Sequence, residues 1–180
     1  MKISYHMRFS SVYTGSKNKY GGKPTHLPSK WPTDPRDGSE MAFLCQIYCE
    51  DKIFTLPDTL CIQLYQPLDS KGRLCEGMYF VQIPNGAEIN AENIGIVAPD
   101  YDEGDITLEM VEEEDTFEEN TKKDIDVFES KLLGWYPAEE FDQENIFLGW
   151  FADEDPFIIG AGIQCCLFAD SKGKVITKFC

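Results

Sequence analysis

Residues 41–48 read Met-Ala-Phe-Leu-Cys-Gln-Ile-Tyr, an apolar run with Gln46 as its odd polar residue. A short apolar run bounded by turn-forming residues is typical of a buried strand. If Gln46 is buried there, its amide needs a hydrogen-bond partner such as a backbone group of a neighbouring loop. This run therefore predicts a sheet whose central strand is tied to a loop.

Other segments extend the same interpretation in both directions along the chain. Residues 2–13 alternate, with Ile3, Tyr5, Met7 and Phe9 on one side, as in a half-buried strand. Further strands are expected over 60–65, 78–83, 94–98, 106–111, 146–151, 157–168 and 175–179. Between them, residues 14–40 are rich in proline and glycine and predict a long loop.

The best helical window is 121–133, where Ile125, Phe128 and Leu132 recur at three and four residues and Gly134 follows as a C-cap. Strands outnumber helices, so we expect an α+β fold that is predominantly antiparallel β with few short helices. The length of 180 residues fits a single domain over residues 1–180.

Two similar turns hint at an internal repeat. Asp69-Ser70-Lys71-Gly72 and Asp170-Ser171-Lys172-Gly173 each follow an apolar strand-like run. They could mark two pseudo-repeated halves, although the tetrapeptide is also simply a good turn sequence.

The negative charge is concentrated in one part of the chain. The net charge is −16, and residues 100–126 contribute −11 of it, with 13 acids and two lysines. We expect an acidic loop or insertion at about 100–126, which is either a solvated segment or a docking face for a basic protein or peptide. The candidate partner-binding residues are Asp100, Asp102, Glu103, Asp105, Glu112, Glu113, Glu114, Asp115, Glu118 and Glu119.

Nucleic acid and membrane are not expected as partners. The loop over 14–40 carries lysines among aromatic residues, but a charge of −16 repels phosphate, so these lysines are better explained as an internal complement to the acidic stretch or as ordinary loop solvation. No apolar run approaches the roughly 18 residues of a membrane span.

Catalytic, metal and cofactor motifs are not legible in the sequence. No nucleophile elbow, phosphate loop or zinc-type Cys-x-x-Cys pair occurs, and His6 and His26 are interpreted as structural or surface residues. We therefore expect no catalytic residues, no metal and no cofactor. Seven cysteines and no secretion signal predict a cytoplasmic protein with reduced thiols.

Two motifs resemble the YwqG-like family of bacterial proteins of unknown function, which is distantly related to programmed cell death protein 2. The first runs from Gly21-Gly22-Lys23-Pro24 through Trp31-Pro32 to the 41–48 strand, and the second is Lys131-Leu132-Leu133-Gly134-Trp135-Tyr136-Pro137. The resemblance implies a duplicated, mostly β fold without catalytic residues. Its motif residues are Gly21, Gly22, Pro24, Trp31, Pro32, Phe43, Gln46, Gly134, Trp135 and Pro137.

The resulting functional hypothesis is a non-enzymatic protein-binding module that holds a basic partner, as an immunity-type inhibitor or a peptide or assembly chaperone would. Charge complementarity would speed the encounter between the two. An enzyme whose site is assembled from distant residues, and a structural subunit of a complex, stay open as alternatives.

Overall fold

Ten strands and one short helix form the described part of the chain. The computed structural model describes residues 1–51, 53–98, 102–126, 129–136, 144–154, 157 and 164–179. The strands are β1 (Lys2–Ser10), β2 (Lys19–Tyr20), β3 (Ala42–Tyr48), β4 (Thr59–Gln66), β5 (Tyr79–Pro84), β6 (Gly104–Glu113), β7 (Lys131–Leu133), β8 (Ile146–Phe151), β9 (Cys165–Ala169) and β10 (Val175–Phe179), and the helix is α1 (Phe117–Lys122). The expected fold class, mostly antiparallel β with few helices, is confirmed.

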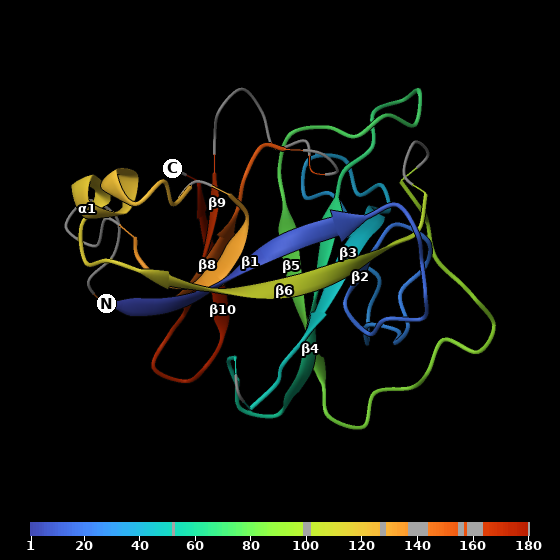
Figure 1. Cartoon of the computed structure of the whole chain (residues 1–180). Helices are drawn as coiled ribbons and strands as arrows, with labels where there is room; N and C mark the ends of the chain where they lie inside the picture. The colour runs from blue at the N-terminus through green and yellow to red at the C-terminus, as the bar shows by residue number, and fades with distance from the viewer. Residues whose placement is uncertain are drawn as a thin grey trace.

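The strands form one antiparallel sheet whose order is symmetric. The order is β10-β9-β8-β7-β1-β6-β2-β3-β4-β5, with the β1–β6 ribbon at its centre (Figure 1). If each of β1–β5 is exchanged with its counterpart in β6–β10, the result is the same order read from the other end. The chain therefore consists of two pseudo-repeated halves. The first strand of each half pairs with the second strand of the other, because β1 pairs with β7 and β6 pairs with β2.

Local details repeat between the halves as well. The ladder between β3 and β4 shifts register between Phe43 and Cys45, and the ladder between β8 and β9 shifts between Phe147 and Gly149. A β-bulge therefore occurs near the start of the third strand in each half.

The two Asp-Ser-Lys-Gly turns are equivalent in structure. Asp69 Oδ1 accepts from the backbone N–H groups of Lys71 (2.8 Å) and Arg73 (2.9 Å), while Gly72 N–H donates to Asp69 C=O (2.8 Å). Asp170 forms the same three bonds: its Oδ1 accepts from the backbone N–H groups of Lys172 (2.8 Å) and Lys174 (2.9 Å), and its C=O accepts from Gly173 N–H (2.9 Å). Each turn connects the fourth and fifth strands of its half, which confirms the structural equivalence that the sequence hinted at.

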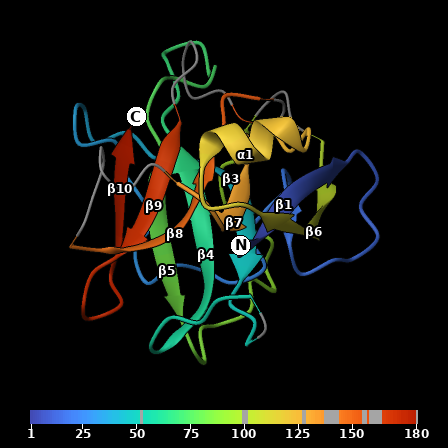
Figure 2. The ribbon, with the colours of Figure 1, turned by 60° about the vertical axis from the view of Figure 1, so that its left-hand side comes forward.

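The sheet curls into a nearly closed barrel whose seam lies between β5 and β10 (Figure 2). The Gln82 side chain bridges this seam. Its Oε1 accepts from Val175 N–H (2.9 Å) and its Nε2 donates to Gly173 C=O (2.9 Å). One amide side chain thus replaces part of a strand ladder where the two edge strands meet.

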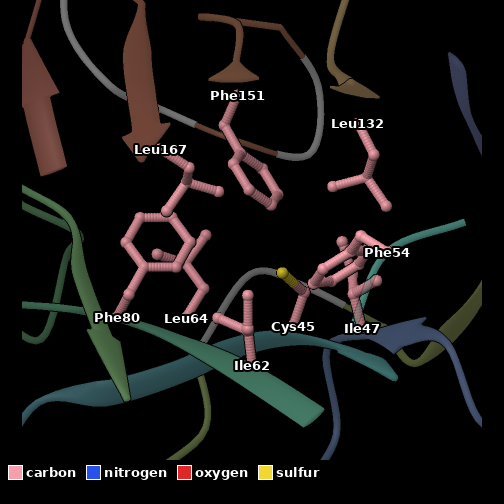
Figure 3. A pocket seen from close by; sticks show the side chains of 9 residues that line it. All are labelled: Cys45, Ile47, Phe54, Ile62, Leu64, Phe80, Leu132, Phe151 and Leu167. Carbon is pink, nitrogen blue, oxygen red and sulfur yellow. The ribbon is translucent and has the colours of Figure 1, made fainter. Parts of the chain in front are cut away.

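Apolar side chains from both halves fill the barrel. In Figure 3 the side chains of Cys45, Leu64 and Phe80 from the first half face Phe151 and Leu167 from the second. The space left between them is about 10 Å³. That is barely the volume of one water molecule, and the lining is apolar, so this space is a packed core and no ligand site.

Several sequence expectations are wrong in detail. The helix spans 117–122 and not 121–133, because Lys131–Leu133 form β7 between β1 and β8. Residues 94–98 form no strand and join the sheet only through an isolated bridge between Phe43 and Val97. The acidic loop or insertion at about 100–126 is instead built largely from β6 and α1, since the long β6 pairs along its whole length with β1.

Candidate functional site

The acidic residues of β6 fall on both faces of the central ribbon. Ile106 and Leu108 face the barrel core with Met7 and Phe9 of β1. Side chains alternate along a strand, so the odd-numbered residues of β6 lie on the opposite face. Asp105 and Glu113 are buried on that opposite face, whereas Glu109 and Glu112 are exposed, so the predicted acidic stretch does not form one continuous face.

Glu113 is fully buried in an ionic cluster. Its exposed fraction is 0%, as is that of Lys131. Glu113 Oε1 accepts from Lys131 Nζ (2.6 Å) and His6 Nε2 (3.2 Å), and Oε2 accepts from Trp135 N–H (2.5 Å). Burial alone would raise the pKa of Glu113, but the bonds to His6 and Lys131 lower it to about 2. Glu113 is thus an internal counter-ion and is unable to meet a partner.

His6 joins this cluster to the protein surface. Its Nδ1 lies 2.9 Å from Glu129 Oε2, and its Nε2 contacts Glu113. Burial lowers the pKa of His6, but the hydrogen bonds to the two carboxylates outweigh it and raise the pKa above its usual value. Since ionised carboxylates only accept hydrogen bonds, both ring nitrogens carry protons and the imidazole is charged.

Arg8 and Glu109 complete the ionic cluster, in which positive and negative charges are equal in number. Arg8 donates to Glu129 from Nη1 (2.6 Å) and to Glu109 from Nε (2.7 Å). His6, Arg8 and Lys131 then supply three positive charges against three carboxylates, while Lys131 Nζ also lies 4.8 Å above the Trp150 ring. Exposed fractions of 0–2% at His6, Glu113 and Lys131 leave no room for a substrate among them. The cluster holds β1, β6 and β7 together.

A second buried lysine occupies the matching place in the first half. Lys19 is 5% exposed, lies in β2 as Lys131 lies in β7, and forms an ion pair with Glu103. Nearby, Asp105 accepts from Thr14 through both the backbone N–H (3.2 Å) and Oγ1 (2.5 Å). Glu103 and Asp105 therefore serve the fold, and Lys19 is a residue of the basic loop that complements the acidic stretch.

The residues before Lys19 anchor the first half. Ile106 N–H donates to Asn18 C=O (2.9 Å), and Tyr48 N–H donates to Asn18 Oδ1 (2.8 Å). Gln46 Nε2 donates to Lys17 C=O (2.8 Å). Two strands, β3 and β6, are thus tied to the short segment that leads into β2.

The second half repeats this pattern around the residues before Lys131. Met7 N–H donates to Ser130 C=O (2.8 Å), Ala152 N–H donates to Ser130 Oγ (2.9 Å), and Trp150 Nε1 donates to Glu129 C=O (2.8 Å). The sequence did not reveal this equivalence, because the two segments share little. Each has only a polar residue before its lysine, Asn18 or Ser130, and a glycine three residues after it, Gly22 or Gly134.

The first family-like motif fastens the long loop to the sheet. Gln46 is fully buried, and its Oε1 accepts from Thr25 N–H (2.9 Å), which confirms the expected loop partner. Gly21 has φ +64°, and a Cβ there would lie 2.3 Å from Asp102 O, so only glycine fits. Pro24 is buried and its C=O accepts from Asn90 Nδ2 (3.0 Å).

The aromatic residues of the same motif pack on the outside of the sheet. Trp31 Nε1 donates to Met41 C=O (2.9 Å), and Pro32 C=O accepts from Met41 N–H (3.0 Å). Trp31 packs edge-on to Tyr65, which also contacts the fully buried Phe43. Trp31 therefore anchors the loop to the sheet.

In the second motif, Gly134 and Trp135 support Glu113. Gly134 has φ +87°, and a Cβ there would lie 2.4 Å from Glu113 Oε2 and 2.5 Å from Ser4 Cβ. Trp135 supplies the backbone N–H that Glu113 accepts. Pro137 and Asp100 lie outside the described residues.

The remaining acids lie at the end of β6 and around α1, next to two aromatic residues. We call this region the α1 surface, and its residues are Glu112, Asp115, Phe117, Glu118, Glu119, Asp124 and Trp135. Among the described residues, Glu112, Glu118 and Asp124 form no ion pair. Asp115 binds the N-terminal ammonium at 3.0 Å, and Glu119 bonds Thr116, the N-cap of α1. Glu114 is partly buried and pairs with Lys123.

An aromatic pair accompanies these carboxylates. The rings of Phe117 and Trp135 lie 6.1 Å apart, and Phe117 is 44% exposed. Of the ten predicted partner-binding acids, the structure thus brings Glu112, Asp115, Glu118 and Glu119 together, leaves Asp102 exposed elsewhere, and assigns Glu103, Asp105, Glu113 and Glu114 to internal contacts.

The cysteines divide into two groups. Cys45, Cys49, Cys61, Cys75 and Cys165 are free, and burial raises the pKa of Cys61 and Cys165 to about 12, so both thiols are protonated. The expectation of reduced thiols is wrong for Cys166, which is disulfide-bonded. Within the described ranges, no three His, Cys, Asp or Glu side chains form a metal-binding group. No described helix is long and apolar enough to cross a membrane.

Comparison with known proteins adds no relative: no protein-family model and no curated protein matches this chain. The resemblance to the YwqG-like family accordingly stays a prediction.

Proposed function

We propose that this chain is a non-enzymatic protein-binding module that holds a basic protein or peptide on its α1 surface, as an immunity-type inhibitor or an assembly chaperone would. The observation that supports this function best is the set of exposed carboxylates around α1 that the fold does not use, beside the half-exposed Phe117. The buried acids of the same stretch already have internal partners.

The chemistry of the α1 surface suits arginine and lysine side chains. The carboxylates supply long-range attraction that speeds encounter and weakens with salt. The aromatic pair of Phe117 and Trp135 offers a flat apolar contact on which a guanidinium stacks. The cytoplasm is the compartment that this proposal assumes.

A labelled deca-arginine peptide is the probe that tests the α1 surface. We compare the wild type with the triple variant Glu112→Gln, Glu118→Gln, Asp124→Asn by fluorescence anisotropy at low and physiological salt. Loss of at least fivefold in affinity is expected in the variant, and weaker binding of the wild type at higher salt.

The matched control is the triple variant Glu50→Gln, Asp58→Asn, Glu76→Gln, which removes the same charge from exposed positions elsewhere. It should bind the peptide within twofold of the wild type. Equal losses in the two variants would show that the peptide senses only net charge, and the α1 surface would be rejected as a docking site.

A further inference from the structure

A groove of about 260 Å³ lies between the proline-rich loop and the loop that follows β5. It is lined by Trp31, Glu40, Ile94, Gly95 and Ile96. In Figure 1, α1 lies at the left end of the β1–β6 ribbon, while the yellow-green loop after β5 runs along the right-hand side. The groove is therefore separate from the α1 surface.

The aromatic wall of the groove is fixed in place. Besides its hydrogen bond to Met41, the Trp31 ring meets Tyr65 at 5.2 Å between centroids and an interplanar angle of 85°. A Cβ at Gly95, where φ is +134°, would lie 2.6 Å from the Trp31 ring. The indole thus packs directly on backbone, and its position does not depend on a mobile side chain.

The opposite wall of the groove is formed by Ile94, whose side chain is partly exposed. Ile94 is 48% exposed, yet both of its backbone groups are bonded to Asn90: Ile94 N–H donates to Oδ1 (2.8 Å) and Nδ2 donates to Ile94 C=O (2.7 Å). Asn90 is itself tied to the first motif, since its N–H donates to Thr25 C=O (2.8 Å). The backbone that carries this exposed apolar side chain is therefore held in place.

Glu40 supplies the charge of the groove. Its backbone pairs with Thr33, its carboxylate is exposed, and it forms no ion pair with any described residue. The groove thus combines an indole, two isoleucines and one carboxylate, which match the apolar stem and the cationic head of a long basic side chain. Its volume lies below the roughly 300 Å³ at which small-molecule pockets begin.

We propose that this groove binds a single arginine side chain presented by a partner protein. The planar guanidinium stacks on Trp31 and bonds Glu40, while its methylene stem contacts Ile94 and Ile96. Arginine fits better than lysine because a guanidinium both stacks on aromatic rings and forks onto a carboxylate. This site goes beyond the proposed function and does not require the α1 surface.

The test uses the full chain labelled with 15N and follows the indole N–H resonance of Trp31, identified with a Trp31→Phe variant. Nα-acetyl-arginine amide is titrated, with Nα-acetyl-norleucine amide as an uncharged comparison. A saturable shift of the Trp31 resonance is expected with arginine, a fivefold or greater weakening in Glu40→Gln, and no saturation with norleucine.

The charge-matched control is Glu76→Gln, which should bind within twofold of the wild type. The inference is overturned if arginine produces no saturable shift, if Glu40→Gln and Glu76→Gln bind alike, or if norleucine binds as well as arginine. Since the α1 triple variant leaves Trp31 and Glu40 untouched, failure of deca-arginine binding at α1 and failure of this groove are separate results.

Discussion

At the scale of single residues, the ionic cluster shows how a chain of high negative charge can keep charged groups inside. Glu113 satisfies both carboxylate oxygens with His6, Lys131 and the Trp135 backbone. A buried ion pair adds little stability relative to apolar residues, but loss of one member leaves an uncompensated charge. Glu113 is therefore the residue at which a small chemical change has the largest consequence.

Replacing Glu113 with Gln should destabilise the protein by about 3 kcal/mol, because Lys131 keeps its charge without its buried counter-ion and His6 loses one of its two carboxylate partners. Urea unfolding at pH 7 measures this change. Glu112→Gln, one residue away and exposed, is the control and should stay within about 0.5 kcal/mol of the wild type. Equal stabilities of the two variants would contradict the role assigned to Glu113.

At the scale of elements, the two Asp-Ser-Lys-Gly turns are the clearest copies of one local structure. In each, one aspartate carboxylate accepts two backbone N–H groups, and these bonds lower the pKa of Asp69 and Asp170. The same sequence forms the same turn between equivalent strands, so the effects of mutation should also be equivalent.

Asp69→Ala and Asp170→Ala should each lower the Tm, and by similar amounts, since each removes the same pair of backbone contacts and the additional ion pair of Asp69 with the exposed Arg73 contributes little. Differential scanning calorimetry makes the comparison. Ser70→Ala and Ser171→Ala in the same turns should leave the Tm unchanged. A loss confined to one turn would mean that their hydrogen bonds are not energetically equivalent.

The elements that sequence patterns predicted are those with apolar runs or clear alternation. The strands at 42–48, 146–151 and 175–179 have bounds close or identical to those expected, since their burial is encoded locally. The short strands β2 and β7 could not be found in this way, because each starts with a buried lysine whose carboxylate partner lies elsewhere in the chain.

The same limit applies to the candidate site. Sequence alone grouped ten acids as one docking face, but Glu113 and Asp105 look identical to their exposed neighbours until strand pairing places them. An available signal was the alternation of Ile106, Leu108 and Met110, which marks the acidic segment as a strand with one apolar face. The groove at Trp31 and Glu40 involves residues more than 50 positions apart and has no local signature.

At the scale of the whole molecule, the barrel is closed by a side chain and not by a complete ladder. Gln82 supplies both an acceptor and a donor across the seam between β5 and β10. Without it, Val175 N–H and Gly173 C=O lose these partners, and because both residues are only partly buried, the loss costs about 1 kcal/mol.

Gln82→Leu should therefore destabilise the protein by about 1 kcal/mol and speed hydrogen exchange at the Val175 amide. Gln82→Glu retains the acceptor for Val175 N–H, so exchange at that amide should stay close to the wild type. Unchanged protection of Val175 in Gln82→Leu would show that the seam does not depend on this bridge.

The crossed pairing of the two halves also has a consequence for synthesis. β1 is made early, yet its partners are β6 and β7, and Lys2 pairs with Glu113, more than 100 residues later. During translation, β1 must wait with its apolar residues and backbone groups unpaired until both partners have left the ribosome. Contacts this distant in sequence slow folding and expose the nascent chain to aggregation. Because β1 pairs with strands of the second half, it can take its place in the sheet only after β7 has been synthesised.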